Sequence, residues 1–126
     1  MVGLIIQGSS IILILLLHKI ILHLLKIILL LLKRILLLKR TQLFLILIEI
    51  IRKINQLLVD EIEIEENQIY PAADLKKDLG IDSLDFVDLF VIIERNFGVK
   101  MKAEEMADIK SLQDFYDYII NRVRSN

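Results

Sequence analysis

A single serine, Ser83, lies between two aspartates in the stretch DLGIDSLDFVDLF, residues 78–90. A nucleophilic serine needs a base within hydrogen-bond reach and N–H donors for an oxyanion. The two histidines, His18 and His23, lie far earlier in the chain, cysteine is absent, and no G-x-S-x-G elbow surrounds the serine. We therefore predict that the chain has no catalytic residue, so Ser83 needs another explanation.

The aspartates near Ser83 raise a second kind of chemistry, which is calcium binding. An EF-hand loop needs acids at alternate positions and then a glycine. The acids here step by three or four residues, which is the spacing of a helix face. They are Asp74, Asp78, Asp82, Asp85 and Asp88. We predict no metal site, and Ser83 taken alone is interpreted as a cap or first-turn residue of a helix.

Two amphipathic helices are predicted to flank the region of Ser83. The earlier helix ends near Val59, and the last helix of the chain follows a Ser111 cap. Both have apolar residues at i, i+3, i+4 and i+7 spacing, which predicts one buried face each. These faces comprise Leu47, Ile50, Ile51, Ile54, Leu57 and Leu58, and Leu112, Phe115, Tyr116, Ile119, Ile120 and Val123.

The helix that contains Ser83 is predicted to begin there or one residue later, with Asp82 as its N-cap. It runs to Phe97, where Gly98 supplies the stop. Its polar stripe of Asp85, Asp88, Arg95 and Asn96 is interrupted by Ile92, which we expect to be exposed. The opposite arc is wide, and we expect it to be covered on two sides. It comprises Leu84, Val87, Leu89, Phe90, Val91, Ile93 and Phe97.

The connection between the first two helices is predicted to be a loop, because Pro71 and Gly80 interrupt it. Its EIEIE stretch alternates like a strand but has no partner strand. Four apolar residues are expected to anchor this loop on the core: Ile62, Ile64, Ile69 and Leu75. A short helical turn is expected at residues 103–107.

Residues 1–42 form a leader of almost uninterrupted Leu and Ile. Lys19, Lys26 and Lys33 recur every seven residues and share one helical stripe with His23 and Arg34. A transmembrane helix would hold charges mid-span, at a cost of about 3 kcal/mol each. A membrane-surface helix tolerates the stripe, although the apolar arc is unusually wide. A third interpretation is a translation start placed too far upstream, so that the leader is no part of the natural protein. All three stay open.

The charge of the chain is divided between two regions. All 17 acidic residues lie from Glu49 onward, together with 10 of the 16 basic ones, whereas the formal net charge of the whole chain is only −1. An acidic domain repels the phosphate backbone, which excludes nucleic acid as a partner. Basic protein surfaces are the expected partners, with charge mainly speeding encounter. We therefore divide the chain into the leader, residues 1–42, and an acidic domain, residues 43–126.

The acidic domain resembles the acyl carrier protein family. The resemblance is carried by DLGIDSLD, by the acidic and apolar helix that ends in FGV, and by the closing DIKSLQDFYDYI, and it spans about residues 47–122. The fold that it implies is all-α, a small bundle of three or four helices with a long first loop. It also implies a monomer that works in the cytoplasm, or at a membrane if the leader belongs to the protein.

The resemblance implies that Ser83 receives 4'-phosphopantetheine from coenzyme A through a separate phosphopantetheinyl transferase. The thiol of that arm would carry acyl groups as thioesters. Further partners implied are acyl-transfer, ketosynthase, reductase and dehydratase enzymes. Their docking residues would be Asp82, Leu84, Asp85, Asp88 and the exposed Ile92. An acyl chain would lie between the helices, lined by Leu84, Val87, Phe90, Val91 and Ile109.

Several residues depart from the pattern of the family. Glu63 replaces a common glycine in the first loop, and Phe86 and Phe90 are bulkier than the usual Thr and Val. Arg95 and Asn96 replace glutamates, and Lys102 replaces a proline. Fatty acid synthesis and a specialised lipid or polyketide pathway both stay open. The alternatives to a soluble carrier are a helical adaptor that is never modified and a membrane-tethered carrier.

Overall fold

The computed structural model describes the backbone of residues 2–125 and the side chains of residues 10–125. It divides into two compact units, residues 1–44 and residues 45–126, and we call the second the C-terminal unit. The helices are α1 (Val2–Ile62), η1 (Glu66–Gln68), α2 (Ser83–Phe97), η2 (Ala103–Asp108) and α3 (Leu112–Ser125). No strand occurs between residues 2 and 125, where the one β-bridge joins Asp74 to Ser111. The predicted all-α fold is confirmed.

The described backbone of the first unit is helical, and the side chains of residues 10–44 lie outside the hydrophobic core. Between residues 11 and 38, every Leu and Ile is between 45% and 64% exposed. By length and composition, one helix in the described residues could cross a membrane. It is Ser10–Ile62, with a mean hydropathy of 2.4 in its most apolar window and none of that window buried.

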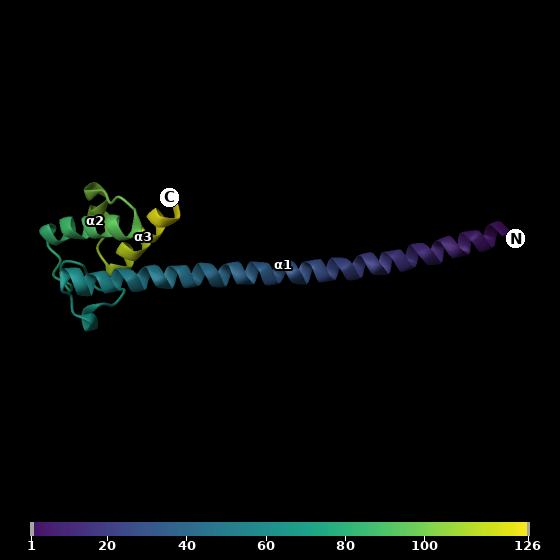
Figure 1. Cartoon of the computed structure of the whole chain (residues 1–126), viewed down its shortest axis with the longest axis horizontal. Helices are drawn as coiled ribbons and strands as arrows, with labels where there is room; N and C mark the ends of the chain where they lie inside the picture. The colour runs from purple at the N-terminus through teal and green to yellow at the C-terminus, as the bar shows by residue number, and fades with distance from the viewer. Residues whose placement is uncertain (1, 126) are drawn as a thin grey trace. The chain divides into compact units, whose positions relative to one another are not determined.

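The C-terminal unit has a single hydrophobic core. The end of α1, drawn teal in Figure 1, packs with the green α2 and the yellow α3. Ile54, Ile93 and Ile119 have no exposed surface, and one residue of each helix thus lies at the centre. The predicted faces of α1 and α3 are confirmed: all their residues are buried or half-buried. Among described residues, no charged side chain is buried, and the buried Tyr116 donates its hydroxyl to Asn55.

The loop between α1 and α2 is fixed to the start of α3 by backbone hydrogen bonds. Leu75 N–H donates to the carbonyl of Lys110 at 2.9 Å, and Leu112 N–H donates to that of Ala73 at 2.9 Å. Leu75 and Ile64 are buried, as predicted, while Ile62 and Ile69 pack half-buried against the core. The loop also buries Ala73, Leu79 and Ile81. A loop with this many anchors holds the start of α2 in place.

The end of α1 lies three residues beyond the predicted end at Val59. Glu63 follows Ile62 in the left-handed conformation, with φ 62°. This residue reverses the chain, so that Ile64 N–H donates to the carbonyl of Leu58 at 3.1 Å. Left-handed backbone is the ordinary end of a helix and favours glycine. The sequence has Glu63 and no glycine here, so the usual local signal for a helix end is absent.

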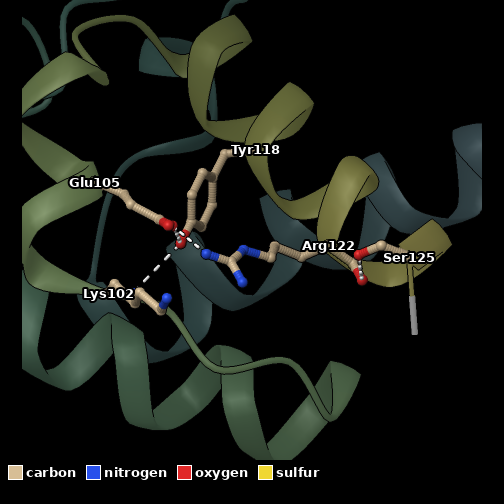
Figure 2. A network of polar contacts seen from close by, with 5 residues as sticks. All are labelled: Lys102, Glu105, Tyr118, Arg122 and Ser125. Carbon is tan, nitrogen blue, oxygen red and sulfur yellow. Dashed lines mark hydrogen bonds and ion pairs between the residues drawn. The ribbon is translucent and has the colours of Figure 1, made fainter.

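A polar network holds η2 against α3 (Figure 2). The Tyr118 hydroxyl donates to Glu105, and the Arg122 guanidinium forms an ion pair with the same carboxylate. Arg122 also lies over the Tyr118 ring, 5.3 Å from its centroid. The contact of Tyr118 and Arg122 with Glu105 lowers the pKa of that carboxyl. The predicted short turn is therefore η2, and this network ties it to the last helix.

Candidate functional site

Ser83 is the first residue of α2, and the two aspartates beside it cap that end. Asp85 N–H donates to Asp82 Oδ1 at 2.8 Å, and Asp82 N–H donates to Asp85 Oδ2 at 3.1 Å. This reciprocal pair is a capping box, which satisfies two N–H groups that the first turn leaves without partners. The predicted Asp82 N-cap and the helix bounds are confirmed.

The Ser83 side chain is exposed, and its hydroxyl makes no hydrogen bond to any group in residues 2–125. Serine is a common N-cap residue, but the N-cap of α2 is Asp82. Of the two places offered for Ser83, a cap or the first turn, the structure has the first turn. The hydroxyl is left free to react with an incoming group.

The segment before Ser83 is anchored to the core on both sides of a glycine. Leu79 and Ile81 are buried, while Gly80 between them is exposed and has φ 67°. Asp74 Oδ1 accepts from the N–H groups of Lys77 and Lys76 at 2.8 and 2.9 Å, which lowers the pKa of Asp74. These contacts fix the direction from which the chain enters α2.

The outward face of α2 is apolar as well as acidic. Leu84, Val87 and Val91 are 72%, 56% and 52% exposed, and we call these three residues the α2 apolar stripe. They follow i, i+3 and i+7 spacing, so they share one face of the helix with the exposed Asp88. The expectation that the apolar arc of α2 is covered on two sides is wrong for these residues.

Ile92 is the second correction on α2. The expected exposed contact is 9% exposed and therefore buried, although it lies outside the main core cluster. Val91, one residue earlier, is the exposed side chain instead. Position 92 is about 100° further round the helix than position 91, which brings it closer to the buried Leu89 and Ile93. The expected exposure of Ile92 is therefore wrong.

The same geometry corrects the expected lining for an acyl chain. Leu84, Val87 and Val91 point outward, so they do not line a space between the helices. Phe90 and Ile109 are half-buried, as is Phe86, which packs against the core. Apolar residues occur on several sides of α2, so no spacing in the sequence distinguishes this outward face.

The chemistry available around Ser83 is limited to carboxylates. Asp82 and Asp85 are engaged in the capping box, and they accept from backbone N–H groups rather than from the serine. In the described part of the chain, no three His, Cys, Asp or Glu residues are grouped so that they could hold a metal ion. The arrangement offers an exposed nucleophile that would take its base from another protein.

Comparison with known proteins adds the family context. A family model described as the phosphopantetheine attachment site matches residues 47–119. The acyl carrier protein of Thermosynechococcus vestitus is 36% identical over 75 residues, which cover 60% of this chain and 93% of that protein. The acyl carrier protein of Rubrobacter xylanophilus is 33% identical over 72 residues, 57% of this chain and 89% of that protein. The acyl carrier protein of Phytoplasma mali is 36% identical over 74 residues, which cover 59% of this chain and 88% of that protein.

Proposed function

The chain belongs to the acyl carrier protein family, and from this premise we propose that Ser83 is the residue that receives the phosphopantetheine arm. As a member of the family, the chain carries acyl groups. One observation supports Ser83 above all: its hydroxyl is exposed and unbonded at the first residue of α2. Ser111, in contrast, accepts from Asp114 N–H at 3.1 Å as a helix cap.

The attachment step needs only a reachable oxygen on this chain. Ser83 Oγ forms a phosphodiester bond as the phosphoanhydride bond of coenzyme A breaks and the nucleotide portion leaves. The hydroxyl proton passes to a base on the transferase. Once attached, the arm supplies the thiol that bears acyl groups as thioesters. This division explains why the chain acts as a substrate of other enzymes and not as a catalyst.

The residues around Ser83 fit such a group. The modified oxygen lies at the N-terminus of α2, where the helix dipole favours a phosphate. The capping box keeps this turn formed without using the Ser83 hydroxyl. The buried Leu79 and Ile81 hold the approach to the site, so an arm attached at Ser83 extends from a fixed point into solvent.

Docking of partners is assigned to the outward face of α2. Asp82, Leu84, Asp85 and Asp88 surround Ser83, and the α2 apolar stripe takes the role expected of Ile92. Acids steer basic partners at long range, whereas apolar side chains give short-range affinity.

Reversing one charge on this face tests the assignment. At low salt, Asp88→Lys should lower the kcat/KM of the transferase by about tenfold relative to the original chain. Added salt should bring the two kcat/KM values closer together. Asp117→Lys, on α3, is the matched control.

The partners are the phosphopantetheinyl transferase and the acyl-transfer, ketosynthase, reductase and dehydratase enzymes of one pathway. We place this work in the cytoplasm, in fatty acid synthesis or a related lipid or polyketide pathway. Arg95 is exposed toward the end of α2, where it makes that helix less acidic. Half-buried Phe86 and Phe90 add bulk beside the core. Both features bear on which partner and which cargo fit.

Incubation with coenzyme A, Mg²⁺ and a phosphopantetheinyl transferase tests the proposal. The intact mass should rise by one arm in the original chain and in Ser111→Ala. Ser83→Ala should show no gain, although its helical circular dichroism should be unchanged. An equal gain in Ser83→Ala would contradict the proposal. A second outcome would also contradict the proposal: the folded original chain gains no mass, and its stable complex with a partner survives Ser83→Ala. An unmodified adaptor would behave in this way.

A further inference from the structure

The leader leaves a large apolar surface without a partner. From residue 11 to residue 38 the chain is Leu or Ile at every position except six: His18, Lys19, His23, Lys26, Lys33 and Arg34. All these Leu and Ile side chains are close to half exposed or more. Contiguous exposed apolar surface of this extent marks a protein or membrane contact.

The basic residues of the leader lie along one side of the helix. Lys19, Lys26, Lys33 and Arg40 are exposed and separated by seven residues each. Each step of seven drifts by only about 20° around a helix. The four charges therefore form a stripe about 32 Å long at 1.5 Å per residue. His23 and Arg34 lie within about 60° of Lys19, whereas Lys39 lies on the opposite side close to the end of the stripe.

A second copy of the chain is a poor occupant for this surface. A soluble coiled coil buries positions a and d of each heptad and keeps the outer positions polar. In residues 11–38 the polar residues are those of the stripe, the neighbouring His23 and Arg34, and His18, and all remaining positions are Leu or Ile. A dimer would leave most of the apolar arc in water, and a helix apolar almost all round belongs in a core or a membrane.

A transmembrane span also fits poorly. Spanning needs about 20 predominantly apolar residues. Every 20-residue window between residues 11 and 38 contains at least two Lys or Arg, each costing about 3 kcal/mol at mid-span, and the uncharged run before Lys19 contains Gln7, Gly8, Ser9 and Ser10. A span placed before Lys19 would also leave the Leu and Ile residues after it uncovered. A helix in the plane of the membrane covers the whole arc at once.

We propose that residues 11–40 lie in the plane of an anionic lipid surface, with the basic stripe toward the headgroups. The Leu and Ile arc enters the acyl boundary, and Lys19, Lys26, Lys33 and Arg40 attract the negative headgroups. The long stem of Lys39 lets its charge reach the surface from the opposite side. The C-terminal unit has 17 acidic residues against 10 basic ones, so the attraction belongs to the leader alone. This inference does not depend on Ser83.

Flotation of the full chain with vesicles tests this assignment. The chain is synthesised in the presence of vesicles of phosphatidylcholine, or of equal parts phosphatidylcholine and phosphatidylglycerol. It should bind the anionic vesicles more tightly, because each basic residue near such a surface strengthens binding roughly fivefold. The variant K19Q/K26Q/K33Q/R40Q should lose at least about tenfold in affinity for anionic vesicles. The control K76Q/K77Q/K100Q/K110Q has the same net charge, and it should keep the original affinity.

Oriented circular dichroism on aligned anionic bilayers distinguishes the two membrane geometries. The leader helix should lie parallel to the bilayer plane. A perpendicular helix, with equal flotation on both kinds of vesicle, would establish a transmembrane span and overturn the proposal. Absence of flotation on either kind, or an equal loss of affinity in the control variant, would also overturn it.

Discussion

Leu and Ile side chains are exposed in the described part of the leader, whereas many of them are buried in the C-terminal unit. Ile14 in the leader is 62% exposed, whereas Ile54 in the C-terminal unit has no exposed surface. Both lie on α1, so neither residue type nor secondary structure explains the difference. The leader has apolar residues on nearly every side of the helix, whereas residues 47–58 restrict them to one face with the exception of the exposed Ile48. Periodicity, more than hydrophobicity, decides which Leu and Ile residues build a protein core.

Removing one side chain from the core should give the largest effect. The fragment 45–126 contains the whole core, and Ile54→Ala in it should lower the free energy of unfolding by about 2–5 kcal/mol, because a cavity replaces buried methyl groups. Urea denaturation followed by circular dichroism measures it. Ile46→Ala, at a position that is 55% exposed, should change stability by less than about 0.5 kcal/mol. If the two variants lost equal free energy of unfolding, the distinction between buried and exposed positions would be contradicted.

Loss of the capping box should give a smaller effect on the C-terminal unit. Asp82→Ala removes the acceptor for Asp85 N–H and should cost about 1 kcal/mol of stability. The same variant should be modified more slowly, because the first turn that presents Ser83 frays. Asp88→Ala removes an exposed acid that makes no hydrogen bond within the described chain, and its stability should stay near the original. A Tm of Asp82→Ala no lower than that of Asp88→Ala would argue against the cap.

The end of α1 offers a stabilising change. Glu63 has φ 62°, where glycine is free of the clash that other residues suffer, so Glu63→Gly should raise stability by about 0.5–1 kcal/mol. Glu65→Gly is the control, because Glu65 has φ −69° and glycine there only adds freedom to the unfolded chain. Thermal unfolding should move the two Tm values in opposite directions. A fall in both would mean that the left-handed turn is not formed.

Acid should weaken the contact between η2 and α3. Folding lowers the pKa of Glu105 below 4.5, through Tyr118 and then Arg122, so its contribution to stability is present above pH 4.5 and is lost as pH falls through the lowered pKa. Glu105→Gln should therefore reduce the drop in Tm on acidification. It should not abolish the drop, since Asp74 and Asp114 also have lowered pKa values. Glu104→Gln replaces an exposed neighbouring residue, and the Tm of this variant should change with pH as the Tm of the original chain does.

Much of the fold follows from local signals in the sequence. The start and end of α2 are marked by Asp82 and Gly98, and the start of α3 by Ser111, and each of these signals acts within one turn. The orientation of α2 could not be read in this way. Its central residues are apolar on several sides, so only packing decides that Ile92 is buried and Val91 exposed. The hydrogen bond between Tyr116 and Asn55 joins residues from α3 and α1, and no local pattern predicts such a pair.

The part of the candidate site that depends on local signals was predictable from the sequence. Ser83 and its capping aspartates are contiguous, so their arrangement follows from helix geometry. The α2 apolar stripe depends on which side of the helix the core covers, and that is set by the distant Ile54 and Phe115. The described side chains of the leader, residues 10–42, contact no core, so only the positions of the basic residues indicate how the leader is oriented.

The most direct test of the central claim is to locate the arm on the modified chain. Trypsin should release residues 78–95, between Lys77 and Arg95, in which Ser83 is the only residue with a hydroxyl group. After incubation of the full chain with coenzyme A and the transferase, mass spectrometry should find one phosphopantetheine on this peptide and fragmentation should place it at Ser83. An unmodified 78–95 peptide, with the added mass on another serine such as Ser111, would contradict the account.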